Sequence, residues 1–234
     1  MARLRRVPLV LYSVGLDSDQ HRRWFHRACL RFICSTAKSI LVRDEFSLHH
    51  LKNIGFSQTK VAPDAAFLQP PQIFTAGSKR TGVTIYVAEL TRRTIKKVST
   101  STVRDSYFQS LWNAARPHLL RDETLVVSCS SSGDIEDAQH FAEWLLTHKL
   151  WPNIDVRPPT SLENFLSQIV STRIVISTRM HPLIAAKIYG TPAFAVPLNA
   201  KTANMYTVIS NANSIDLSAE AARLLSSEIE TYFR

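Results

Sequence analysis

The stretch RIVISTRMHPLIAAKIYGTPAFAVP, residues 173–197, decides the fold. Its first six residues are a β-branched, apolar run that predicts a buried strand. A helix is expected over residues 181–190, with Pro182 in its first turn and Gly190 just past its end. Residues 191–197 return to a strand pattern. Strand, helix and strand in this order predict two parallel strands that are joined by a crossover helix.

The same alternation extends over the rest of the chain. Further strands are expected at residues 7–14, 39–42, 83–90, 124–131 and 154–156, with a short extended piece from Val61. Further helices are expected at residues 22–39, 47–55, 103–119, 135–148, 161–170, 202–210 and 218–233. Asp134 and Ser161 are expected to cap the helices that begin beside them, and Gly15 is expected to end the first strand in a turn. Regular alternation of strands and helices predicts the α/β class, with parallel sheets that carry helices on both faces.

A polar stretch with two prolines and two glycines, QPPQIFTAGSKRTG at residues 69–82, interrupts the pattern. Its composition is that of a linker. We therefore expect two Rossmann-like parallel-sheet domains. The first is a partial N-terminal α/β domain over residues 1–75. The second is a C-terminal α/β domain over residues 76–234 that includes the closing helices.

The charge balance favours an acidic partner. Lys and Arg number 28 against 19 Asp and Glu, which gives a net charge of +9, while 45% hydrophobic residues exclude disorder as the default state. Nucleic acid, an anionic membrane or a phosphorylated small molecule all fit this charge. The basic stretch TRRTIKK at residues 91–97 is either a solvated loop or a contact for phosphate. A nucleic-acid binder is disfavoured, because no reading motif is present and the aromatic residues fall at core spacing.

The first expected helix has an apolar and a basic face. Arg23, Arg27 and Arg31 lie on the basic face, and the spacing of the other face is typical of a helix that packs on a core. The apolar positions are Trp24, Phe25, Ala28, Cys29, Phe32 and Ile33.

The cysteine content indicates a reducing compartment, and the hydropathy predicts no membrane span. The three cysteines are too few for a disulfide framework and form no CxxC pair, so a thiolate zinc site is not expected. No run approaches the roughly 20 apolar residues of a membrane span. Residues 7–16 fit a buried strand better than a signal peptide. We expect a cytoplasmic protein with at most peripheral membrane contact.

The clearest candidate site follows the strand of the deciding stretch. In open parallel sheets, ligands bind at the carboxyl ends of the strands. Arg179 and His181 lie there, at a helix start that attracts anions, and Lys201 follows the next strand. Together they predict an anion site with a titratable group. The alternative is that His181 is only the first residue of a helix.

Other charged residues also follow predicted strands. Arg43 and Asp44 come directly after the strand at 39–42; they either face an anion or form a solvated cluster in which Asp44 or Ser47 caps a helix. Asp64 follows the extended piece at Val61, and its alternative is a Pro-Asp turn. Arg92 and Arg93 come after the strand at 83–90.

Three motifs in order resemble the polysaccharide pyruvyl transferase family. They are VRDEFSLHHLKNIG at 42–55, PDAAFL at 63–68 and VISTRMHPLIAAKIYGTPAFAVPLNAK at 175–201. The resemblance implies a two-domain fold like that of B-type glycosyltransferases, with the active site between the domains. It also implies transfer of a pyruvyl group from phosphoenolpyruvate to a sugar of a surface or exported polysaccharide, free or lipid-linked, usually as a ketal.

The resemblance also assigns roles to residues. His181 is expected to be the catalytic acid/base, while Arg43, Arg179 and Lys201 hold the donor. The secondary candidates are Asp44, Asp64, Arg92 and Arg93. Phosphoenolpyruvate is the donor substrate, and no cofactor or metal is expected.

The sequence departs from the family at its start. Members usually carry an Asn-x-Gly-Asp loop after their first strand and a later Gly-rich stretch, and this sequence has neither. The expected first domain is therefore incomplete. This departure keeps an alternative open: a truncated, catalytically inactive relative that binds an anionic ligand.

Overall fold

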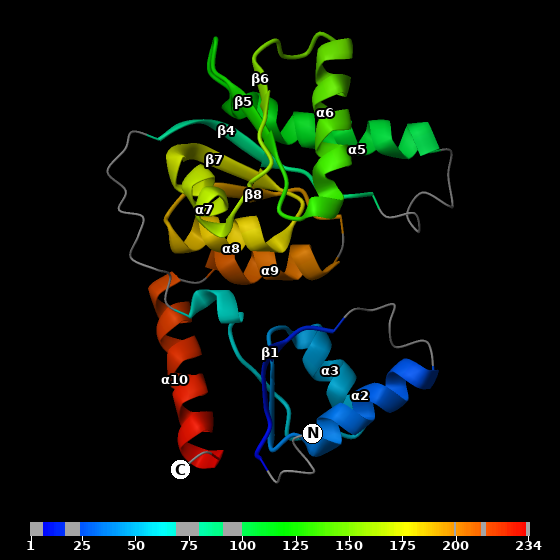
Figure 1. The fold of residues 1–234 in the computed structure, drawn as a ribbon, viewed down its shortest axis with the longest axis vertical. Coiled ribbons are helices and arrows are strands. Elements are labelled where there is room, and N and C mark those ends of the chain that lie inside the picture. The colour runs from blue at the N-terminus through cyan, green and yellow to red at the C-terminus, as the bar shows by residue number, and fades with distance from the viewer. Residues whose placement is uncertain are drawn as a thin grey trace. The chain divides into compact units, whose positions relative to one another are not determined.

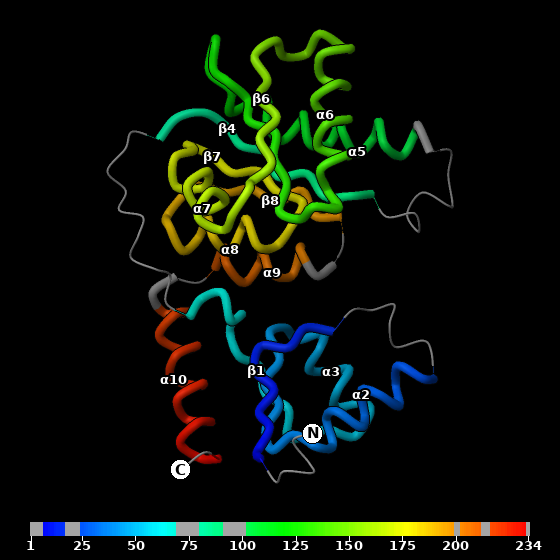
Figure 2. Tube along the Cα trace, viewed as in Figure 1, coloured from blue at the N-terminus to red at the C-terminus, as the bar shows by residue number. Residues whose placement is uncertain are grey.

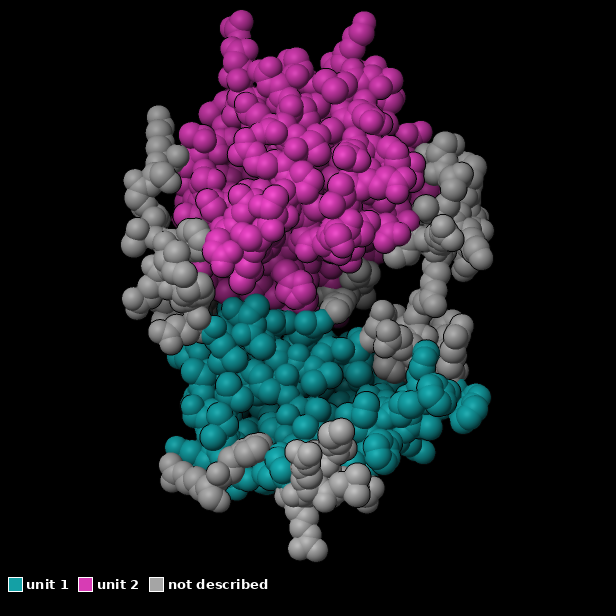
Figure 3. Space-filling view, viewed as in Figure 1, with its two compact units in different colours: residues 1–70, 212–234 teal, residues 71–211 magenta. Residues whose placement is uncertain are grey.

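The structure is a computed structural model that describes residues 7–16, 24–68, 80–90, 100–198, 200–211 and 214–232. The chain divides into two compact units (Figures 1 and 3): residues 1–70 with 212–234, and residues 71–211. Each unit has its own parallel sheet with helices against it. The expected α/β class with two parallel-sheet domains is confirmed.

The first unit contains a three-stranded parallel sheet in the order β1-β2-β3. Its register pairs Leu11 with Ile40 and Leu41 with Lys60. The elements are β1 (Val10–Val14), α2 (Trp24–Thr36), β2 (Ser39–Val42), α3 (Glu45–Asn53), β3 (Lys60–Val61), the 3-10 turn η2 (Ala65–Phe67) and α10 (Ser214–Tyr232).

Helices lie on both faces of this sheet (Figure 1). On one face, Leu11, Ile40 and Val42 pack with residues of α2 and α3. On the other face, the Tyr12 hydroxyl donates to the Ala221 carbonyl of α10 at 2.8 Å. The helix α10 therefore packs in the first unit, whereas the sequence analysis placed it in the C-terminal domain. The apolar stripe of a helix predicts that the helix packs on a sheet, but the stripe does not specify which sheet.

The second unit contains a five-stranded parallel sheet in the order β6-β5-β4-β7-β8. The strand β4 lies between β5 and β7 (Figure 2), and its Ile85 pairs with Val127 and with Ile176. The elements are β4 (Thr81–Tyr86), α5 (Thr100–Ala115), η3 (Arg116–His118), β5 (Leu125–Ser128), η4 (Ser132–Asp134), α6 (Ile135–Thr147), β6 (Ile154–Val156), α7 (Leu162–Ser171), β7 (Thr172–Ser177), α8 (Met180–Ile188), β8 (Ala193–Ala195) and α9 (Ala200–Asn211).

Alternate residues of the central strands face opposite sides of this sheet. Val83, Ile85 and Val87 pack with α5 and α6 in the larger core, whereas Tyr86 and Val175 pack with α7 and α8 on the other side. Full burial on both faces explains why these strands are apolar runs. It also leaves the ends of the strands as the place for polar groups.

Two helix ends confirm the local signals of the sequence. The Ser161 hydroxyl accepts from the Asn164 N–H at 3.1 Å and caps α7. Gly190 follows α8 with φ of 64°, a left-handed conformation that glycine adopts without strain.

The prediction that the apolar face of the first helix packs on the core is wrong. Trp24, Phe25 and Phe32 of α2 are 80%, 59% and 61% exposed, while the same helix buries Cys34. Apolar residues occupy more than one face of α2, and only the stripe through Leu30 and Cys34 meets the sheet. Helical periodicity alone does not distinguish the two faces.

Candidate functional site

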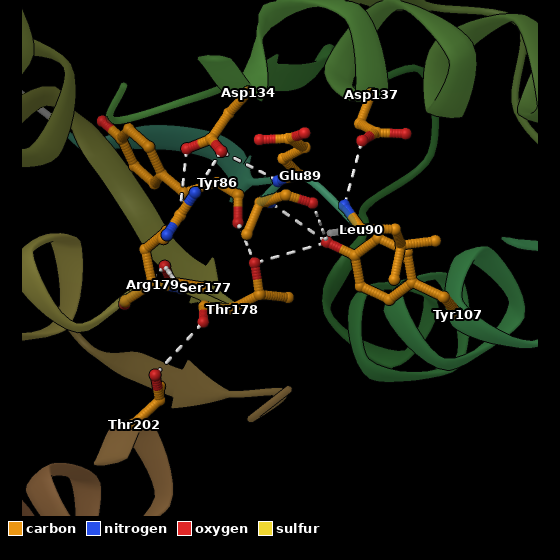
Figure 4. A network of polar contacts seen from close by, with 11 residues as sticks. Tyr86, Glu89, Leu90, Tyr107, Asp134, Asp137, Ser177, Thr178, Arg179 and Thr202 are labelled. Atoms are coloured by element: carbon orange, nitrogen blue, oxygen red, sulfur yellow. Dashed lines mark hydrogen bonds and ion pairs between the residues drawn. The ribbon is translucent and has the colours of Figure 1, made fainter. Parts of the chain in front are cut away.

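Polar side chains gather at the carboxyl ends of the strands of the second unit. Arg179 follows β7, Asp134 ends the turn after β5, and Glu89 follows β4. These three strands are neighbours in the sheet, so their carboxyl ends meet at one edge. Figure 4 shows the resulting network of polar contacts.

Arg179 and Asp134 form a bidentate ion pair. Nε of Arg179 donates to Oδ2 of Asp134 at 3.0 Å, and Nη2 donates to Oδ1. The Asp134 side chain is fully buried, whereas that of Arg179 is 40% exposed. The third nitrogen of the guanidinium, Nη1, has no hydrogen-bond partner among the described residues. Arg179 is thus held rigidly and keeps one donor for a ligand.

Asp134 has a different role from the predicted one. The sequence analysis expected it to cap α6, but within the described part of the chain its side chain makes no cap bond to that helix. Oδ1 instead accepts from the Glu89 N–H at 2.8 Å and from Arg179. The carboxylate therefore ties the turn after β4 to the turn after β7.

The electrostatics of the pair favour the charged form of Arg179. Burial of the Arg179 guanidinium opposes its charge, but hydrogen bonding and charge attraction from Asp134 outweigh burial and raise the pKa of Arg179 above its ordinary value. Because the two charges cancel, Arg179 presents a directed hydrogen-bond donor rather than a free positive charge.

A tyrosine and two threonines fix the turn that carries Arg179. The Tyr107 hydroxyl donates to the Ala88 carbonyl and accepts from the Ala88 N–H, both at 3.0 Å, and lies 3.3 Å from Oγ1 of Thr178. Burial raises the pKa of Tyr107 to about 12, so the hydroxyl stays protonated. Thr202 of α9 donates to the Thr178 carbonyl at 3.4 Å. The end of β7 is therefore held from α5 and from α9 (Figure 4).

His181 lies in the first turn of α8, as the sequence predicted. Arg179 is the N-cap residue of this helix, Met180 is its first residue, and the His181 side chain is exposed. The N–H groups of a first helical turn carry partial positive charge and bind anions. His181 and Arg179 are thus brought to one turn of the chain.

Three other predicted residues are placed only in part or not at all. Lys201 lies in the first turn of α9, and its side chain is outside the described part of the structure. Arg92 and Arg93 lie outside the described residues, so their assignment stays a prediction.

The corresponding edge of the first unit is organised around Arg43. Nη1 of Arg43 donates to Oδ2 of Asp64 at 2.9 Å, and Nε lies 4.0 Å from Oδ2 of Asp44. Arg43 is 13% exposed and Asp64 is 6% exposed. The Nε of Arg43 is buried without a hydrogen-bond partner among the described residues. The structure therefore brings together three of the predicted site residues, Arg43, Asp44 and Asp64.

Both carboxylates also cap short structural elements. Oδ1 of Asp44 accepts from the Ser47 N–H at 2.7 Å at the start of α3, and Oδ1 of Asp64 accepts from the Ala66 N–H at 3.0 Å in η2. The structural interpretations of Asp44 and Asp64 therefore hold alongside their contact with Arg43.

Gly15 provides the space for Arg43. A Cβ atom at this position would lie 2.6 Å from Nη2 and 2.8 Å from Cζ of Arg43. The guanidinium thus packs against the backbone at Gly15, which only glycine allows. Sequence reasoning assigned Gly15 to a turn and missed this contact, because the spacing along the chain gives no sign of it.

Two further kinds of feature are absent from the described part of the chain. There, no group of three or more His, Cys, Asp or Glu side chains is placed to hold a metal ion. None of the described helices is long and apolar enough to cross a membrane.

The family model for polysaccharide pyruvyl transferases matches residues 1–199 of the 234. The chain belongs to the polysaccharide pyruvyl transferase family. The match confirms the resemblance carried by the three motifs, and it makes the chain an enzyme of the transferase class with a role in pyruvyl transfer to polysaccharides. No protein with a curated description matches the chain.

Solved structures share the fold at low sequence identity. Anabaena HepE, in complex with UDP and glucose, has a TM-score of 0.54 at 12% identity, covering 97% of this chain and 73% of that one. UDP-GlcNAc 2-epimerase from Neisseria meningitidis, bound to UDP-GlcNAc, has a TM-score of 0.55 at 11% identity, covering 98% and 71%. These likenesses concern the fold alone, and they confirm the expected B-type glycosyltransferase architecture.

Proposed function

We propose that the protein transfers a pyruvyl group from phosphoenolpyruvate to a sugar of a surface or exported polysaccharide and forms a ketal. Family membership supports pyruvyl transfer to a polysaccharide. The observation that carries the choice of donor is the turn after β7, where Arg179 and His181 meet the N-terminus of α8. This turn combines a directed donor, an anion-binding helix start and a titratable group.

The proposed reaction has two steps. In the first, a sugar hydroxyl loses its proton and its oxygen bonds to C2 of phosphoenolpyruvate, while the double bond between C2 and C3 opens and C3 takes up a proton and becomes a methyl group. In the second, a neighbouring hydroxyl bonds to C2, the bond from C2 to the phosphate oxygen breaks, and the hydroxyl proton leaves with the phosphate. A diol and phosphoenolpyruvate thus give a cyclic ketal and inorganic phosphate.

The chemistry requires two anionic groups of the donor to be held while protons move. His181 is the proposed general acid/base, since imidazole titrates near neutral pH. Arg179 offers Nη1 to the carboxylate or phosphate of the donor, and the first turn of α8 offers its N–H groups. Proton transfer and charged groups suffice for this scheme, so it calls on no cofactor.

The remaining candidates support the donor in the proposal. Arg43 and Lys201 are assigned to the anionic groups of the substrates. Asp44 and Asp64 lie beside Arg43 and contact its guanidinium. Arg92 and Arg93 are assigned to attraction of the donor. The acceptor is a polysaccharide or a lipid-linked sugar, and no nucleic acid takes part. Phosphoenolpyruvate is a cytoplasmic metabolite, so the proposal places the reaction in the cytoplasm.

A donor test decides the proposal. Purified protein is mixed with phosphoenolpyruvate and a panel of pyranosides with free neighbouring hydroxyls, phosphate release is measured, and calorimetry measures donor binding. Phosphate release that depends on the pyranoside supports the proposal. Donor binding without release on any acceptor favours the inactive relative that binds an anion. A protein that neither binds phosphoenolpyruvate nor releases phosphate would contradict the assignment of the donor.

A further inference from the structure

The outward face of α2 is an exposed cluster of aromatic side chains. Trp24, Phe25 and Phe32 are 80%, 59% and 61% exposed, and Ile33 is 46% exposed. Single exposed apolar residues are common on protein surfaces, but three large aromatic residues within nine positions of one helix are not. These three residues, called the aromatic face below, therefore point to a partner surface.

The inward and outward sides of α2 are distinct. Leu30 and Cys34 are one turn apart and pack with the sheet of the first unit. At 100° per residue, Phe25 and Phe32 point nearly the same way, and Trp24 lies on their flank. The aromatic face therefore turns away from the core that the same helix covers.

Basic residues border the aromatic face, and acidic residues are missing from the helix. Arg27 and Arg31 are both exposed and lie one turn apart on one flank of the face. The sequence of α2, WFHRACLRFICST, contains no Asp or Glu. In the sequence, Arg22 and Arg23 come directly before it. Aromatic residues flanked by arginine, without acidic residues, are typical of helices that lie in the interface of an anionic membrane.

We propose that α2 docks the first unit on an anionic membrane surface. The aromatic face enters the headgroup region, and Arg27 and Arg31 contact lipid phosphates. Charge complementarity favours this partner, since arginine next to an anionic leaflet is attracted at short range. A second copy of the chain fits less well, because two copies of the face related by a twofold axis bring like charges together.

This inference extends the proposed function. A lipid-linked acceptor is displayed on a membrane, so docking through α2 brings the enzyme to that acceptor. The link to the acceptor rests on the proposed function, but the docking itself does not. Vesicle binding measured without any substrate therefore fails or succeeds independently of phosphate release.

The experiment is co-sedimentation of the whole protein with vesicles of phosphatidylglycerol and phosphatidylcholine, compared with phosphatidylcholine alone. The test variant Trp24→Ser/Phe25→Ser/Phe32→Ser removes the aromatic face. Its control is Leu146→Ser/Leu162→Ser, at positions in the second unit that are 53% and 65% exposed. The charge variant Arg27→Gln/Arg31→Gln is compared with Arg116→Gln/Arg121→Gln, which removes two exposed arginines elsewhere.

Binding to the anionic vesicles is expected to fall at least about tenfold in the aromatic variant. The loss in the charge variant is expected to be about fivefold for each arginine. Both controls should bind like the parent. A second readout is the blue shift of tryptophan emission on vesicle addition. Trp24→Phe should abolish it, because Trp24 is 80% exposed on α2, whereas Trp112, Trp144 and Trp151 are buried or half-buried in the second unit.

Two results would overturn the proposal. One is equal binding of the aromatic variant and the parent, with unchanged circular dichroism for both. The other is a parent protein that does not bind anionic vesicles but forms a dimer in solution, when the aromatic variant stays monomeric. That result would make α2 an interface between copies of the chain. Circular dichroism checks folding, and the exposure of all substituted residues predicts that it stays intact.

Discussion

Arg179 and His181 lie two positions apart, but the structure gives them different environments. The guanidinium is fixed by a buried carboxylate, whereas the imidazole is exposed in the first turn of α8. A fixed donor suits binding of an anion, and an exposed titratable ring suits proton transfer. Replacement of Arg179 should therefore affect mainly donor binding, and replacement of His181 should affect mainly turnover.

Replacement of His181 is expected to affect turnover more than binding. Loss of a positioned acid/base typically costs roughly 100- to 10,000-fold in rate, so His181→Ala should release phosphate at least 100-fold more slowly while phosphoenolpyruvate still binds. Phosphate release and calorimetry measure the two quantities. His148→Ala, an exposed histidine at the end of α6, is the control. An active His181→Ala enzyme contradicts the assigned role.

Asp134 is expected to act on the donor through Arg179. Asp134→Ala removes the bidentate partner of Arg179 and the acceptor of the Glu89 N–H, so the free energy of unfolding should fall by about 1–3 kcal/mol. Donor affinity should fall as well, because Arg179 loses its direction. Asp134→Asn keeps an oxygen that can accept from Glu89 and Arg179. Its stability and donor affinity should therefore lie between those of the parent and those of Asp134→Ala.

A double-mutant cycle separates positioning from general damage. If Asp134 acts through Arg179, Asp134→Ala should change donor affinity in the parent and leave it unchanged in the Arg179→Ala background. Equal effects in both backgrounds would mean that Asp134 supports only the fold.

Gly15→Ala is expected to disturb Arg43 more than the fold. The new methyl group would lie within 3 Å of the guanidinium, which can move only by leaving Asp64. Donor affinity should therefore fall toward that of Arg43→Ala, and the melting temperature should fall no further than in Arg43→Ala, which also leaves the buried Asp64 without its partner. Calorimetry and thermal unfolding measure the two effects. A large loss of stability with unchanged affinity would place Arg43 in the fold alone.

At the scale of elements, Glu123 joins the amino ends of three strands. Its carboxylate accepts from the Gly82 N–H at 2.9 Å, from the Leu120 N–H at 3.1 Å and from Arg173 at 2.8 Å. Gly82 lies in β4, Arg173 in β7, and Glu123 two residues before β5. The amino edge of the sheet is thus held by one side chain, opposite the edge that carries the candidate site.

This arrangement predicts an acid-sensitive contribution to stability. Burial alone would raise the pKa of Glu123, but hydrogen bonds from Leu120, Arg173 and Gly82 outweigh it and lower the pKa below the ordinary 4.5. The charged form therefore stabilises the fold above pH 4.5, and that contribution is lost as the pH falls through the lowered pKa. Glu123→Gln should be less stable at neutral pH, and its difference from the parent should shrink on acidification. Thermal unfolding between neutral and acidic pH measures this, and a constant difference contradicts it.

The sequence predicts elements better than it predicts their partners. The deciding stretch gave β7, α8 and β8 within a few residues, because β-branched runs, Pro182 and Gly190 act locally. The Arg179–Asp134 pair joins residues 45 positions apart, and the sequence analysis interpreted Asp134 as a helix cap. The strand order explains the pair, since β5 and β7 flank β4, and no local pattern specifies that order.

The aromatic face of α2 and the position of α10 show the same limit. Both helices have the apolar periodicity expected of a packed helix. Much of the apolar surface of α2 is exposed. The helix α10 packs in the first unit, although it lies far from the rest of that unit in the sequence. Which apolar stripe is buried depends on the neighbouring sheet, and a periodicity contains no information about that neighbour.

At the scale of the whole molecule, the net charge of +9 has a kinetic and a thermodynamic meaning. Excess positive charge raises the local concentration of anionic substrates and attracts anionic surfaces, and salt screens both effects. Arg43 and Arg179 are each paired with a carboxylate, so their charges are largely cancelled. Long-range attraction of a donor must therefore come from arginines and lysines elsewhere, and in the sequence the basic stretch at residues 91–97 comes after β4.

Neutralising this stretch should weaken donor binding in a salt-dependent way. In Arg92→Gln/Arg93→Gln, affinity for phosphoenolpyruvate at low salt should fall by roughly two- to thirtyfold, because each exposed charge near an anion contributes about 0.2–1 kcal/mol. The dependence of affinity on salt should flatten, since fewer screened charges remain. Arg116→Gln/Arg121→Gln lowers the net charge by the same two units at the amino edge and should keep the slope of the parent. Calorimetry over a salt series measures all three proteins. If the Arg92/Arg93 variant binds like the parent at low salt, residues 91–97 are only a solvated surface. Equal losses of affinity in both double variants would mean that the attraction depends on the net charge rather than on its placement.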